Sequence, residues 1–247
     1  MRPVRALDGG FNVMGTRVPR VVGLLIGLTL LGSVLGAVGA RNGVRSILQE
    51  GVLAPDLVWS GQVWRLVTWP FFELDGLSLI FGCLALFWFG RDLAYAWGAG
   101  RFLAVYLAFA AAAAGATCLI GRLIWPELLT AAFLGPWAMV DALIIAWAVL
   151  FPHRDVLVYF VLPLRGPKLV YATIGGTVLF ALLHGVGSFV PHFVAEGLML
   201  AYMREPSLHR LWLKFRLGAL QRKAARRPSH LRPVEKDDWG KPPRWLH

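Results

Sequence analysis

Apolar residues dominate six stretches of this chain, and each stretch is close to the length needed to cross a lipid bilayer. The connections between them are polar or charged, and two of them, 98–101 and 185–188, have only four residues. The first stretch ends in a sequence similar to a signal-peptidase site, but its length favours a retained membrane span. The pattern predicts an all-α membrane protein. Its six predicted transmembrane helices are residues 21–40, 77–97, 102–120, 131–151, 169–184 and 189–203.

The amino-acid composition also indicates a membrane protein. Of the 247 residues, 57% are hydrophobic and 16% are charged, whereas about 25% are charged in a typical soluble domain. The formal net charge of +11 could indicate a nucleic-acid partner. Much of it lies in residues 204–247, which hold twelve Lys and Arg against four Asp and Glu. We therefore expect this tail to meet anionic lipid headgroups, and we expect no nucleic acid.

The distribution of basic residues predicts the orientation of the spans. With a cytoplasmic N-terminus, the tail and most other Lys and Arg residues face the cytoplasm, as is usual for membrane proteins. Four arginines then remain outside: Arg41, Arg45, Arg65 and Arg122. We expect a cytoplasmic segment 1–20, a membrane domain 21–203 and a cytoplasmic tail 204–247. Both termini would then face the inside of a bacterial inner membrane or a plasma membrane.

Two regions outside the spans are typical of a membrane interface. The tail contains four apolar residues at helical spacing, which predict a short helix on the inner leaflet before a charged, Pro-rich and disordered stretch 224–247. They are Leu208, Leu211, Trp212 and Phe215. The connection 41–76 is rich in tryptophan and phenylalanine. It is either an interfacial aromatic belt or a loop that lies partly in the outer leaflet.

A motif in this connection resembles one found in a known family. Residues 61–68 read Gly-Gln-Val-Trp-Arg-Leu-Val-Thr, with Trp64 and Arg65 at the centre. This is similar to the Trp-Arg loop motif of the rhomboid family of intramembrane serine proteases, which also occurs in the related derlins. Residues 98–107 resemble the start of that family's third core helix.

Two later motifs extend the resemblance to residues 60–203. Residues 150–163 are similar to the link between the family's fourth and fifth helices. Gly187-x-x-x-Pro191-His192-x-x-Ala195 resembles Gly-x-x-x-Ala-His-x-x-Gly in its sixth helix. Because the four motifs occur in the family's order, the resemblance implies a rhomboid-like bundle of six transmembrane helices.

The residues that perform the family's reaction are largely replaced. The family's nucleophile lies in Gly-x-Ser-Gly, and residues 135–138 read Gly-Pro-Trp-Ala, so Trp137 stands at the serine position. An indole cannot attack a carbonyl carbon. The family's oxyanion pair, His-x-x-x-Asn, corresponds to Ser78 and Gly82, and only His192 keeps its family identity. The resemblance implies a pseudoprotease with no catalytic residues. Such a protein would be a scaffold that binds transmembrane clients, in membrane-protein handling or quality control, without cleaving them.

Ser188 leaves a second interpretation open. It lies four residues before His192, a spacing at which two side chains share one helix face. It could therefore be the unorthodox nucleophile of an active intramembrane protease. The favoured interpretation is a serine that caps the start of the sixth helix.

Two carboxyl groups, Asp141 and Glu196, lie inside predicted spans, where a charge is costly unless it meets a partner or water. Asp141 follows Trp137 by four residues, and Glu196 follows His192 by four. In the family's packing, both carboxyl groups lie about 5.4 Å, one helical turn, deeper than the dyad positions. We therefore expect Asp141, His192 and Glu196 to form one buried polar cluster.

Three roles are open for this cluster, and the first is favoured. It can clamp the fourth and sixth helices through hydrogen bonds. It can contact a polar group in a client span. With His184, it can also hold a metal or a proton, as in a small transporter or proton conductor. Because no spacing matches a known motif such as His-Glu-x-x-His, we expect no metal and no cofactor.

Overall fold

The computed structural model describes residues 10–13, 16–41, 46–158 and 162–204. They belong to one unit, Met1–Arg204. The surface helix predicted after Met203 and the basic tail beyond Arg204 lie outside the described residues, and so does most of the predicted N-terminal segment. The division of the chain into these three parts therefore stays a prediction.

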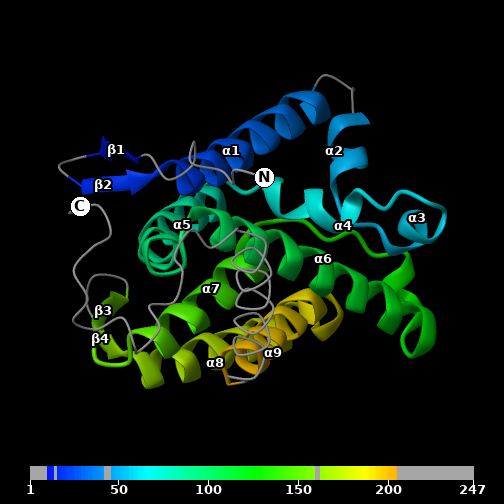
Figure 1. The fold of residues 1–247 in the computed structure, drawn as a ribbon. Coiled ribbons are helices and arrows are strands. Elements are labelled where there is room, and N and C mark those ends of the chain that lie inside the picture. The colour runs from blue at the N-terminus through cyan, green and yellow to red at the C-terminus, as the bar shows by residue number, and fades with distance from the viewer. Residues whose placement is uncertain (1–9, 14–15, 42–45, 159–161, 205–247) are drawn as a thin grey trace, which may run out of the picture. The chain divides into compact units, whose positions relative to one another are not determined.

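The described residues form mainly α-helices, and six of these correspond to the predicted spans (Figure 1). Five are long and apolar enough to cross a membrane, and the other is a shorter apolar helix of 14 residues. The predicted all-α membrane bundle is thus confirmed. The six helices are α1 (Arg20–Arg41), α5 (Gly76–Trp97), α6 (Ala99–Leu123), α7 (Trp137–Leu150), α8 (Gly166–His184) and α9 (Val190–Arg204).

The short helix α7 forms much of the core of the bundle. It packs against α5, α8 and α9, and most of its residues between Ala138 and Ala148 are buried. At 1.5 Å per residue it is about 21 Å long, which is less than the hydrocarbon core of a bilayer. Because protein surrounds most of this helix, its length is matched to its neighbours rather than to the lipid.

Helix α7 begins at Trp137 rather than at residue 131 as predicted. Gly135 has a φ of +105°, a left-handed conformation that interrupts a right-handed helix, and Pro136 occupies the N-cap position. Before them, Phe133 forms an isolated antiparallel bridge with Leu53 through two backbone hydrogen bonds of 2.8 and 2.9 Å. The apolar run 131–136 thus lies outside the helix.

The described part of the connection between α1 and α5, residues 46–75, contains four short helices. They are α2 (Ser46–Gly51), α3 (Pro55–Trp59), α4 (Arg65–Thr68) and the 3-10 helix η1 (Trp69–Phe71). This segment approaches α1 closely, because a Cβ atom added to Gly32 would overlap the carbonyl oxygen of Phe71. The aromatic connection is therefore folded against the bundle.

Two small β-hairpins were not predicted. Strand β1 (Gly10–Val13) pairs with β2 (Thr16–Pro19), and β3 (Asp155–Val158) pairs with β4 (Leu162–Arg165), both antiparallel. Strands of four residues are too short to show a clear alternation of polar and apolar positions. Two further 3-10 turns, η2 (Pro126–Leu129) and η3 (Val186–Phe189), precede α7 and α9.

Large apolar side chains are exposed along α1, α5 and α8. Examples are Leu31 at 56%, Ile80 at 62% and Leu182 at 72% exposure. In a bilayer these side chains contact acyl chains, which are as apolar as the interior of a protein. The exposed apolar surface is therefore the lipid-facing surface of a multi-pass membrane protein.

Candidate functional site

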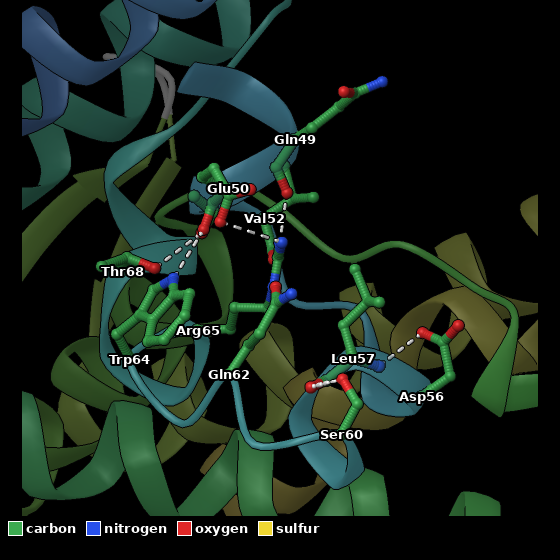
Figure 2. Close-up of polar contacts among 11 residues, drawn as sticks. Gln49, Glu50, Val52, Asp56, Leu57, Ser60, Gln62, Trp64, Arg65 and Thr68 are labelled. Atoms are coloured by element: carbon green, nitrogen blue, oxygen red, sulfur yellow. Dashed lines mark hydrogen bonds and ion pairs between the residues drawn. The ribbon is translucent and has the colours of Figure 1, made fainter. Parts of the chain in front are cut away.

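The Arg65 side chain, predicted as part of the loop motif, is buried and reaches the end of α2 (Figure 2). Its Nη1 atom donates hydrogen bonds to the carbonyl oxygens of Gln49 and, at 2.8 Å, Val52. Its Nε atom donates to Gln62 Oε1 at 2.7 Å, and its Nη2 atom lies 3.5 Å from a carboxylate oxygen of Glu50. The planar guanidinium thus satisfies several acceptors at once.

Two more side chains of the motif donate to carbonyl groups at the same helix end. Trp64 Nε1 donates to the carbonyl oxygen of Glu50 at 3.1 Å, and Thr68 Oγ1 donates to that of Gly51 at 2.7 Å (Figure 2). The last carbonyl groups of a helix have no partner within the helix. The Trp-Arg motif therefore caps the C-terminus of α2 and holds the connection in place.

The residues predicted to stand at the family's catalytic positions are hydrogen-bonded to each other. Trp137, the first residue of α7, donates from Nε1 to Ser78 Oγ at 2.6 Å. Ser78 Oγ in turn donates to Glu73 Oε2 at 2.8 Å. The side chain at the predicted nucleophile position is thereby joined to the side chain at a predicted oxyanion position.

Gly82, the other oxyanion position, packs against the same indole. A Cβ atom added to Gly82 would lie 3.0 Å from Pro136 Cγ and 3.8 Å from Trp137 Nε1. A methyl group at this position would require the proline ring to shift by a few tenths of an ångström. Pro136 and Trp137 thus pack closely against α5 at Gly82.

Glu73 was not identified from the sequence, although it completes this network. Its Oε1 atom accepts the backbone N–H groups of Leu74 at 2.9 Å and Asp75 at 3.1 Å. Its own N–H donates to Ser33 Oγ of α1 at 2.9 Å. Asp75 caps α5 by accepting the N–H of Ser78 at 2.7 Å. The signal available in the sequence was the position of Glu73, an acidic residue two positions before the capping Asp75 at the start of α5.

Asp141 and His192 lie together, and Glu196 has a different hydrogen-bond partner. His192 Nδ1 is 2.8 Å from Asp141 Oδ2, which joins α7 to α9. Glu196, only 3% exposed, accepts a hydrogen bond of 2.6 Å from Thr177 Oγ1 of α8. Thr177 was not identified from the sequence, because a threonine inside an apolar helix carries no specific signal. The polar interior is therefore built from two pairs.

Neither Ser188 nor His184 joins these pairs. Ser188 is exposed in η3, and within the described part of the chain its hydroxyl has no hydrogen bond, either to His192 or to a helix end. His184 is exposed, and its Nδ1 atom lies 3.2 Å from the carbonyl oxygen of Phe180 in its own helix. Among the described residues, no three His, Cys, Asp or Glu side chains are grouped closely enough to hold a metal ion.

The family of the chain follows from its similarity to known proteins. No curated protein that was compared matches the chain. The family model of the Rhomboid domain matches residues 60–204, which is more than half of the chain and includes the loop motif, Trp137 and His192. This multi-pass membrane protein therefore belongs to the rhomboid family.

Proposed function

We propose that this protein is a rhomboid-fold pseudoprotease, a membrane scaffold that binds transmembrane clients without cleaving them. One observation carries the proposal: Trp137 Nε1 donates to Ser78 Oγ at 2.6 Å. The two positions that would supply a nucleophile and an oxyanion donor satisfy each other instead. Neither is available to a scissile carbonyl group.

The chemistry of the remaining residues supports the same conclusion. His192 and Asp141 resemble the base and the orienting carboxylate of a hydrolase, but such a pair needs a nucleophile to activate. Loss of a single oxyanion donor typically slows an acyl-transfer enzyme by a factor of about 10²–10³. With both the nucleophile and the donor replaced, a covalent route is not expected.

The scaffold role follows from what the fold retains. An exposed apolar surface and an interior with carboxyl groups provide places at which an unstable client helix can pack or find a hydrogen-bond partner. In this proposal both termini face the cytoplasm of a bacterial inner membrane or a plasma membrane, and the basic tail binds anionic lipid headgroups.

The purified protein in proteoliposomes, with a generic transmembrane reporter, tests the absence of proteolysis. We expect no reporter cleavage and no labelling by a serine-directed fluorophosphonate. The Trp137→Ser variant should also remain inactive, because Gly82 supplies no donor. Cleavage by the wild-type protein that disappears in Ser188→Ala would overturn the proposal and establish Ser188 as a nucleophile.

The binding part of the proposal needs a separate measurement. Photocrosslinking groups placed along α5 and α8 should capture transmembrane segments of other proteins in intact membranes. The same groups placed in hairpin β3–β4 serve as the matched control, because the hairpin lies outside the membrane helices. Equal capture at all positions would contradict a specific client surface.

A further inference from the structure

The Asp141–His192 pair leaves two polar atoms unused inside the bundle. Their contact occupies Asp141 Oδ2 and His192 Nδ1. Within the described chain, Asp141 Oδ1 and His192 Nε2 have no hydrogen-bond partner, and neither atom is fully buried. The side chains are 14% and 19% exposed, so a ligand can reach them.

The hydrogen bond determines what kind of group these atoms accept. A carboxylate only accepts hydrogen bonds, so the shared proton is assigned to His192 Nδ1. In a neutral imidazole, Nε2 is then an acceptor. Asp141 Oδ1 is an acceptor as well. Two neighbouring acceptors suit a group that only donates, and Lys and Arg are the charged side chains of that kind.

The charges around the pair favour the same ligand. Glu196 lies four residues after His192 on α9, and it accepts its hydrogen bond from the neutral Thr177 hydroxyl. Among the described residues, neither Asp141 nor Glu196 forms an ion pair with a lysine or an arginine. The Asp141 carboxylate is therefore open to a cationic partner from outside the described chain.

We infer that the Asp141–His192 pair is the recognition site for a basic side chain, Lys or Arg, carried by a transmembrane client segment. This inference rests on the proposed client-binding function and names the chemistry of its partner. A basic residue within a membrane span is costly unless it meets a carboxylate, so binding here would stabilise the client. Asp141 lies in the second turn of α7 and His192 in the first turn of α9, so the client's basic residue should lie near one end of its span.

Synthetic transmembrane peptides test the inference with the full chain in phosphatidylcholine vesicles. Three leucine-rich peptides of equal length carry Lys, Leu or Glu at one position in the outer third of the span. Binding is measured by energy transfer from labelled protein to labelled peptide. We expect the Lys peptide to bind about tenfold more tightly than the Leu peptide, the ratio that one intramembrane polar contact can provide. The Glu peptide should bind no more tightly than the Leu peptide.

The Asp141→Asn variant should lose the preference for the Lys peptide. Asp155→Asn, which removes an exposed carboxylate in hairpin β3–β4, is the matched control and should keep it. Equal binding of the Lys and Leu peptides to the wild-type protein overturns the inference alone, and so does a preference that survives Asp141→Asn. If no peptide binds, the proposed function fails as well. Should Asp141→Asn not fold, the comparison of Lys and Glu peptides on the wild-type protein decides, because equal binding of these two also overturns the inference.

Discussion

The Trp64–Arg65 loop and the site around Trp137 are both hydrogen-bonded networks, but they differ in how far they depart from the rhomboid pattern. The loop keeps the family's Trp-Arg motif and uses it to cap α2. The site departs from that pattern at the positions predicted for the nucleophile and the oxyanion pair, and Trp137, Ser78 and Glu73 are hydrogen-bonded there. The retained loop motif thus serves the fold, whereas the departures lie at the predicted reaction site.

The chain segment that links the two regions packs against α1. The chain between them, Trp69 to Glu73, lies against α1 where Gly32 allows close approach and Ser33 accepts a hydrogen bond from the Glu73 N–H. A change in α1 can therefore act on both regions. Substitutions in each region, ordered by expected effect, test how independent the two networks are.

Arg65→Ala should have the largest effect on stability. It leaves the carbonyl groups of Gln49 and Val52 without their shared donor inside the protein, which should lower the free energy of unfolding by about 3–5 kcal/mol. Thermal unfolding in detergent measures the loss. The exposed Arg122→Ala is the control and should stay within about 0.5 kcal/mol of wild type. A loss below about 1 kcal/mol for Arg65→Ala would show that water replaces the guanidinium.

Gly32→Ala should come next, because the added methyl group overlaps the Phe71 carbonyl oxygen. Overpacking of this kind costs about 1–3 kcal/mol. Gly27→Ala is a matched control in the same helix, since a Cβ atom there has no heavy atom within 4 Å. It should raise helix stability by about 0.5–1 kcal/mol. Equal effects of the two changes on thermal unfolding would rule out a tight contact between α1 and the connection.

The bond between Trp137 and Ser78 should contribute a smaller, measurable coupling. In a double-mutant cycle, Trp137→Phe keeps the apolar ring and Ser78→Ala removes the acceptor, so the two should couple by about 0.5–1.5 kcal/mol. Trp147 Nε1 donates to Asp92 instead, at 3.0 Å. Trp147→Phe combined with Ser78→Ala should therefore be additive within about 0.5 kcal/mol. Additivity for the Trp137 cycle would mean that the hydrogen bond between Trp137 and Ser78 does not contribute to stability.

The deeper polar pairs should show the smallest couplings. Interhelical hydrogen bonds in membranes average about 0.6 kcal/mol, and we expect this value for Asp141→Asn with His192→Gln and for Thr177→Val with Glu196→Gln. A cycle across the pairs, His192→Gln with Thr177→Val, should give less than about 0.3 kcal/mol. Equal coupling within and across the pairs would favour the single cluster predicted from the sequence.

The sequence predicted the helices better than it predicted their ends. Runs of apolar residues identified all six bundle helices, because a bilayer demands them regardless of packing. The start of α7 was placed at residue 131 because the apolar run 131–136 is indistinguishable in composition from the helix that follows. Only the left-handed Gly135 and the bridge from Phe133 to Leu53 separate the two. The bridge depends on a partner residue, Leu53, that lies far away in the chain.

Hydrogen-bond partners in the site were predictable only in part. The spacing of Trp137 and Asp141, together with the family's packing, predicted that Asp141 lies near His192. The two side chains are hydrogen-bonded in the structure. Neither Glu73 nor Thr177 could be inferred in this way. A carboxylate before α5 and a threonine within α8 acquire a role only through the position of a second helix.

By itself, the sequence determined the membrane class of the protein, its helices and its family resemblance, and it led to the prediction that Trp137 stands at the nucleophile position. These properties depend on composition and on residue identity at matched positions. The tertiary structure alone decided that Trp137 bonds Ser78 and that Glu196 bonds Thr177, residues separated by 59 and 19 positions. A hydrogen bond forms only when donor and acceptor come within about 3 Å in a suitable direction, and only the packing of complete helices determines that distance.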